Sequence, residues 1–172
     1  MPFTEIGRLG VAVLLTGVLI WASITDIKDR KIRNVTVLTA LVLFLPWAVM
    51  STGHAVVSDL EAGVIALLAG VAFYSAGWMG AGDAKLFAAA SLFIGLQDLV
   101  GLAVLTALAG GAMAAISLVS RPTRAMTMVA MRGKGDFGRG IPYGVAIAIA
   151  AAALVWGGLL HLTPPWAAAI KS

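Results

Sequence analysis

The sequence contains no cysteine, which excludes disulfides, thiolate zinc sites, thiol nucleophiles and iron–sulfur clusters. Charged residues are also scarce, because Lys, Arg, Asp and Glu together make up 12% of the 172 residues, against about a quarter in soluble domains. Apolar residues make up 60% of the chain. This composition predicts an integral membrane protein, and the length predicts a single domain.

Long apolar runs account for most of the chain. A helix needs about 20 apolar residues to cross a bilayer, and six runs approach that length. They are roughly Leu9–Thr25, Val35–Met50, Gly63–Trp78, Ala84–Leu96, Leu99–Val119 and Tyr143–Leu162. None shows the alternation of a barrel strand, so the fold class is predicted to be all-α, a polytopic membrane protein with about six transmembrane helices. The fourth run is short for a full crossing.

Basic residues gather on one side of this six-helix arrangement. That side holds Lys28, Arg30, Lys31, Arg33, Lys85, Arg121, Arg124, Arg132, Lys134 and Arg139. The other side holds only Arg8 and Lys171. The positive-inside rule therefore predicts that the first, third and fifth loops are cytoplasmic and that both termini are periplasmic. Because these charges are spread over short loops, no nucleic-acid partner is expected.

Two features of the loops and helix ends follow from the same topology. The long loop Ser120–Pro142 is expected to contain a short interfacial helix over Ala125–Met131. Trp47, near the outer end of the second run, is expected to be an ordinary interfacial anchor.

The few acidic residues differ in expected depth. Asp26 ends the first predicted helix on the inner side, and Asp83 directly precedes the fourth helix on the same side. The topology therefore brings two carboxylates to one membrane depth, which suggests an aspartic dyad. Three other acids are expected in or beside outer loops, in contact with water: Asp59, Glu61 and Asp98.

Such a dyad needs no metal, thiol or histidine. The ionised carboxylate takes a proton from water, and the protonated partner donates a proton to a carbonyl oxygen. No cofactor and no metal are therefore expected. The two histidines, His54 and His161, both fall on the outer side, so a Ser–His pair is not available beside the dyad.

The glycines of Gly80-Ala81-Gly82-Asp83 have two interpretations. They would let an extended substrate backbone approach the carboxylate, which makes Gly80 and Gly82, together with Lys85, candidate substrate-binding residues. Alternatively, the segment is a turn in which Asp83 caps the next helix. The segment around Asp26 could likewise be only a charged loop, and Asp29 competes with Asp26 for a catalytic role.

Three stretches resemble the type IV prepilin peptidases, which are GxGD-type intramembrane aspartic peptidases. The first is Ser23-Ile24-Thr25-Asp26 with basic residues and Ile32-Arg33-Asn34 behind it. The second is Gly80-Ala81-Gly82-Asp83-Ala84-Lys85-Leu86, and the third is Gly140-Ile141-Pro142-Tyr143-Gly144-Val145-Ala146. The spacing in the first stretch selects Asp26 over Asp29. Arg33 stands where the family usually has Pro.

The resemblance implies a single transmembrane peptidase domain over residues 1–172 in the bacterial inner membrane. Its catalytic residues would be Asp26 and Asp83. Its partners would be the lipid bilayer and a prepilin or pseudopilin with a basic leader, which is cut at the cytoplasmic face. The chain lacks the cysteine-rich loop of the larger family members and resembles the short form of tight-adherence (Flp-type) pili. It is therefore expected to cleave without methylating the new N-terminus.

Three other functions use the same acidic residues. A transporter or channel would need acids nearer the middle of the membrane or helices broken at matching positions, and Gly110-Gly111 is a candidate break. A magnesium-dependent enzyme acting on lipid phosphates could use Asp26, Asp29 and Asp83 as ligands. A non-catalytic pilus-assembly subunit would tolerate loss of both carboxylates.

Overall fold

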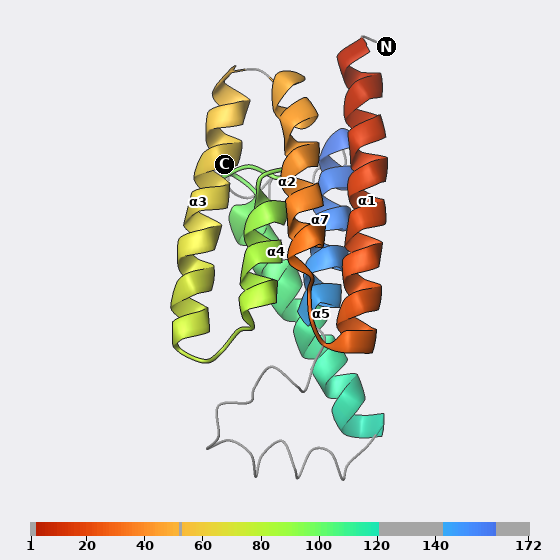
Figure 1. Cartoon of the computed structure of the whole chain (residues 1–172), viewed down its shortest axis with the longest axis vertical. Helices are drawn as coiled ribbons and strands as arrows, with labels where there is room; N and C mark the ends of the chain where they lie inside the picture. Colours follow the sequence, from red (N-terminus) through yellow and green to blue (C-terminus); the bar gives the residue numbers. More distant parts are fainter. Residues whose placement is uncertain (1–2, 52, 121–142, 161–172) are drawn as a thin grey trace, which may run out of the picture.

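The computed structural model describes residues 3–51, 53–120 and 143–160. These residues form helices α1 (Phe3–Asp29), α2 (Asn34–Val49), α3 (Gly53–Ser75), α4 (Ala81–Ser91), α5 (Leu99–Ser120) and α7 (Tyr143–Leu159) (Figure 1). The predicted all-α class is therefore confirmed for the described part of the chain. The predicted interfacial helix Ala125–Met131 and the predicted outer residue His161 lie outside it.

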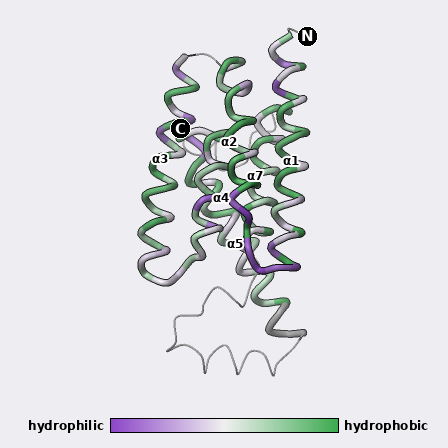
Figure 2. The backbone as a smooth tube through the Cα atoms, in the orientation of Figure 1, coloured by the Kyte–Doolittle hydropathy of each residue, from purple (hydrophilic) through white to green (hydrophobic). Residues whose placement is uncertain are grey.

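The bundle has the composition of a membrane protein. Helices α1, α3 and α5 are long and apolar enough to cross a bilayer, and α2 and α7 are shorter apolar helices. Hydrophobic residues cover most of the helical backbone, whereas the hydrophilic residues concentrate in the connection between α1 and α2 and at helix ends (Figure 2). A helix needs about 20 residues to cross the hydrocarbon core, so α4, with 11 residues, is too short to do so alone.

Helix α4 lies in the middle of the bundle and packs on α2, α3 and α7, while α7 also packs on α1 and α5. The largest fully buried apolar side chains are Leu15, Leu19, Leu86, Leu102 and Ile147. Small residues allow the closest helix contacts, as is usual in membranes. A Cβ on Gly70 of α3 would lie 2.9 Å from the Cβ of Ala84, so a larger residue would push α3 away from the start of α4.

The predicted start of the third helix was wrong, because α3 begins at Gly53 and not at Gly63. Asp59 therefore lies inside α3, where it is 8% exposed, and the prediction that it is solvated was also wrong. Its carboxylate interacts electrostatically with Arg8 of α1. A buried carboxylate needs such an opposite charge, and this one comes from a helix distant in sequence. Glu61 also lies in α3 but remains exposed.

Trp47 is buried, at 2% exposure, so it is not the predicted interfacial anchor. Its ring lies 4.3 Å from the guanidinium carbon of Arg8 and makes an edge contact with Phe93, with centroids 5.6 Å apart. An aromatic face shields and attracts a cation at such a distance. Arg8, Trp47, Asp59 and Phe93 thus connect α1, α2, α3 and the turn after α4, at the end of the bundle away from the α1–α2 connection.

Helix α4 ends at Ser91, whereas its apolar run extends to Leu96. The chain turns at Gly95, whose φ of +80° is a left-handed conformation that glycine adopts without strain. The turn is fastened to α3, because the backbone N–H of Leu96 donates to Oγ of Ser58 at 3.0 Å. Helix α5, in contrast, is continuous through Gly110-Gly111, so the break considered for a transporter is absent there.

Candidate active site

Asp26 lies in the last turn of α1 and is 6% exposed, whereas Asp29 at the end of the same helix is exposed. The helix stops because Arg30 adopts φ of +53°, a left-handed conformation typical of helix C-termini. The chain then returns through Ile32 to the start of α2. Of the two acids that competed in sequence, Asp26 is the one that faces the interior.

The carboxylate of Asp26 meets the beginning of α7. The backbone N–H of Gly144 donates a hydrogen bond to Oδ2 of Asp26 at 2.8 Å. The first N–H groups of a helix have no partner within the helix and form its positive end, so a carboxylate is favoured at this position. An arginine, Arg30, also acts electrostatically on Asp26 from the loop after α1.

The absence of a side chain at Gly144 makes this contact possible. A Cβ on Gly144 would lie 2.8 Å from Oδ2 of Asp26 and 3.0 Å from Cδ1 of Ile32. Sequence reasoning noted the segment Gly140–Ala146 only as part of a family resemblance and missed this function of Gly144. The sequence feature that could have indicated this function is a glycine in the first turn of the last predicted helix, which begins on the same side of the membrane as Asp26.

Asp83 lies in the first turn of α4, and the residue that caps this helix is Gly80. The interpretation of Asp83 as the capping residue itself was therefore wrong. Instead, its carboxylate turns back toward the cap, where it accepts a backbone hydrogen bond from Gly80. An acidic residue three positions after the cap does the same in a capping box. Asp83 thus contributes to starting α4, whatever else it does.

The chain itself occupies the space beside both glycines of the Gly80–Asp83 segment. A Cβ on Gly80 would lie 2.9 Å from Oδ2 of Asp83, and a Cβ on Gly82 would lie 3.1 Å from Cβ of Ile32. These glycines therefore let other parts of the same chain come close. That they also bind substrate stays a prediction.

Ile32 connects the two carboxylate regions, because its side chain lies against both Gly82 of α4 and Gly144 of α7. The charge of Asp26 acts on Asp83, although 57 positions separate them in sequence. The structure therefore places both predicted acids at one end of the bundle, where each lies within range of the charge of the other.

Lys85 follows Asp83 on α4 and is exposed. Its Nζ donates to Oδ1 of Asn34 at 3.2 Å, which connects α4 to the beginning of α2. Among the residues described by the structure, no three His, Asp or Glu side chains form a group that could hold a metal ion.

The fold and this site define a class: a helical membrane protein in which two carboxylates from separate helices interact electrostatically near a helix N-terminus. Residues 13–116 match the model of the type IV leader peptidase family. The chain belongs to this family, as the sequence motifs predicted. The matched range contains Asp26 and Asp83 and ends before α7, so Gly144 lies outside it. No curated protein and no solved structure matches the chain.

Proposed function

We propose that this chain is an aspartic endopeptidase that removes the leader peptides of Flp-type prepilins, with Asp26 and Asp83 as its catalytic pair. The observation that carries the proposal is the electrostatic contact between these two carboxylates at one end of the bundle. Two carboxylates that act on each other electrostatically favour a state that holds a single proton. Family membership supports a leader peptidase in general.

The mechanism follows from one shared proton. The ionised carboxylate accepts a proton from water as the water oxygen bonds to the scissile carbonyl carbon, and the protonated carboxyl gives its proton to the carbonyl oxygen. When the tetrahedral intermediate collapses, the C–N bond breaks. The leaving amine takes a proton from the carboxyl that had accepted one from water. A hydroxyl group of the intermediate gives its proton to the other carboxylate. The pair is then restored with one proton.

The side of cleavage follows from charge. Lys28, Arg30, Lys31 and Arg33 lie in or beside the α1–α2 connection, and Lys85 lies near the start of α4, so this basic region coincides with the dyad. By the positive-inside rule we assign this end to the cytoplasmic face of the bacterial inner membrane, with six helices, of which α4 does not cross alone, and both termini outside. The leader would then be cut where it enters the membrane, by one domain formed from residues 1–172.

The substrate class can be tested with the purified chain in lipid vesicles, a co-reconstituted Flp-type prepilin and an added sulfonium methyl donor. We expect loss of the leader, seen as a gel shift, and a new N-terminus without a methyl group by mass spectrometry. A methylated product would contradict the assignment as a peptidase alone. An uncut prepilin under conditions where the chain remains folded would overturn the proposed function.

Cleavage is expected to continue unchanged in excess chelator, because both catalytic groups are carboxylates that act directly on water and the carbonyl. The measurement is the rate of leader removal before and after prolonged treatment with EDTA. A matched sample with added Mg²⁺ serves as the control. A loss of activity that Mg²⁺ restores would favour the alternative in which Asp26, Asp29 and Asp83 hold a metal ion.

A further inference from the structure

The connection between α1 and α2 contains a single apolar residue, Ile32, among basic ones. Its neighbours Lys31 and Arg33 are exposed, whereas the Ile32 side chain is half-buried and packs against the hydrophobic core. The connection is otherwise hydrophilic (Figure 2). An isoleucine that turns inward from such a segment anchors it, because removal of its apolar surface from water is favourable. Ile32 therefore fixes where the connection crosses the end of the bundle.

Two glycines leave the space that Ile32 occupies. A Cβ on Gly82 of α4 would lie 3.1 Å from Cβ of Ile32 and 3.5 Å from its backbone nitrogen and oxygen. A Cβ on Gly144 of α7 would lie 3.0 Å from Cδ1 of Ile32. These two contact atoms of Ile32 are joined through one carbon, Cγ1, so a single short branch spans the gap between the beginnings of the two helices. No larger residue fits at either glycine unless Ile32 or the backbone moves.

Each of these glycines is directly connected to one of the two carboxylates. Gly82 precedes Asp83 in the chain. Gly144 holds Oδ2 of Asp26 through its backbone N–H at 2.8 Å. The space beside the Gly144 Cα is shared, because a Cβ there would lie 2.8 Å from Oδ2 of Asp26 and 3.0 Å from Cδ1 of Ile32. A change in the length of the Ile32 side chain can therefore displace Asp26 at one end and Asp83 at the other.

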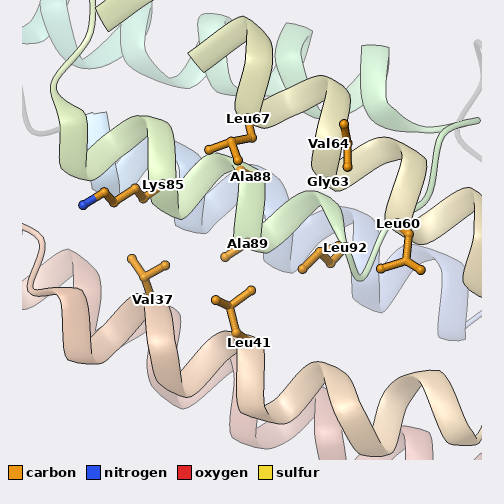
Figure 3. A pocket seen from close by; sticks show the side chains of 10 residues that line it. All are labelled: Val37, Leu41, Leu60, Gly63, Val64, Leu67, Lys85, Ala88, Ala89 and Leu92. Atoms are coloured by element: carbon orange, nitrogen blue, oxygen red, sulfur yellow. The ribbon is translucent and has the colours of Figure 1, made fainter. Parts of the chain in front are cut away.

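Hydrogen bonds fix both ends of the connection, which limits how far Ile32 can move. At the α1 end, the backbone N–H of Arg30 donates to the carbonyl oxygen of Asp26 at 3.0 Å. At the α2 end, Oδ1 of Asn34 accepts from Nζ of Lys85 at 3.2 Å. Lys85 borders an apolar hollow between α2, α3 and α4, and its Nζ points away from the apolar residues that line this hollow (Figure 3). The ammonium therefore bonds to the amide of Asn34, because a charge is costly among apolar groups.

We propose that Ile32 is a positioning residue for the catalytic pair, a spacer whose length sets the separation of the Asp26 and Asp83 carboxylates. This inference rests on the proposed function. A water and the scissile carbonyl must both come within hydrogen-bond reach of the pair, and a misplacement of about 1 Å can cost about 10²-fold in rate. Because Ile32 acts through the two carboxylates and not on the substrate, its truncation should change kcat and not KM.

Shorter side chains at position 32 test the spacer. Ile32→Ala removes the carbons that contact Gly144, and we expect kcat for prepilin to fall at least tenfold while the KM stays within twofold. Ile32→Val removes Cδ1 alone and keeps the branched Cβ beside Gly82, so we expect a smaller fall, of about threefold. The control is Ile27→Ala, the same truncation at a 57% exposed position next to Asp26, which should leave both constants within twofold.

A double-mutant cycle tests whether Ile32 acts through its contact with Gly144. The methyl added by Gly144→Ala would meet Cδ1 of Ile32, and Ile32→Val removes that atom. The two substitutions are therefore coupled, and we expect the double variant to lose at least threefold less kcat than the product of the two single losses. Losses that simply multiply would show that the two residues act independently and would overturn the proposal.

Each variant is assayed in vesicles at a temperature where its thermal unfolding curve shows it to be folded. An unchanged kcat in Ile32→Ala would overturn the proposal, and a raised KM with unchanged kcat would replace it by a direct contact with substrate. A kcat loss that disappears when activity is divided by the amount of folded protein would show that Ile32 only packs. If the wild-type chain itself does not cut prepilin, the proposed function fails, and this inference fails with it.

Discussion

Replacement of either Asp26 or Asp83 by asparagine is expected to abolish prepilin cleavage. Each asparagine keeps the shape of the side chain and can still accept the hydrogen bond from Gly144 or from Gly80, so the fold is preserved. It cannot, however, take a proton from water or pass one to a carbonyl oxygen. Loss of a general acid or base costs about 10²–10⁴-fold in rate, and loss of a shared proton is expected at the upper end of that range.

The matched control is Asp29→Asn, which makes the same chemical change three residues away on α1, at an exposed position. It is expected to cut prepilin at the wild-type rate. Leader removal in co-expressing cells, read as a gel shift, distinguishes the variants. Wild-type cleavage by both dyad variants would overturn the catalytic assignment and return the transporter and assembly functions to consideration.

Gly144→Ala is expected to lower kcat by about 10²-fold, since a misplacement of a catalytic group by about 1 Å can cost that much. The added methyl would lie 2.8 Å from Oδ2 of Asp26, so the carboxylate must move off the Gly144 N–H. The KM for prepilin is expected to stay within twofold, because the added methyl acts on the Asp26 carboxylate and not on Gly80, Gly82 or Lys85, the residues predicted to bind substrate. Steady-state kinetics in vesicles measure both constants.

Gly158→Ala is the control for this effect, because it makes the same substitution on α7 at a position with no atom within 4 Å. It should leave both constants and the thermal unfolding temperature unchanged. If Gly144→Ala lowers the unfolding temperature but leaves kcat intact, Gly144 has a packing function only. A kcat equal to that of the wild type would exclude it as a positioning residue for Asp26.

The apolar runs predicted the ends of α2 (Asn34–Val49) and α5 (Leu99–Ser120) closely, because these helices are apolar along their whole length. They failed at the start of α3, because Ser58, Asp59 and Glu61 interrupt the hydrophobicity that marks a membrane segment. The helix continues there because Arg8, 51 positions earlier, meets the charge of Asp59. A window of local sequence cannot contain that contact.

The same difference between local patterns and distant contacts applies to the site. The position of Asp26 and Asp83 at the same end of the bundle could be inferred from topology and motif spacing, since both depend on local patterns and on the order of the helices. The hydrogen bond from Gly144 could not, because it depends on how α7 packs against α1, 118 positions away. The sequence likewise predicts that Gly80 and Gly82 bind substrate, but it cannot show that their nearest neighbours in the fold are Asp83 and Ile32 of the same chain.

The bond between Asp26 and Gly144 joins the first helix to the last, and this has a consequence during synthesis. Asp26 enters the membrane early, but its donor does not exist until the ribosome has passed residue 144 and α7 has been inserted. Until then the carboxylate lacks its hydrogen-bond donor, and α1 lacks α7, one of the helices on which it packs. With the catalytic role proposed for Asp26, a growing or prematurely terminated chain has no assembled site, and we expect that it does not cut pilins inserted beside it.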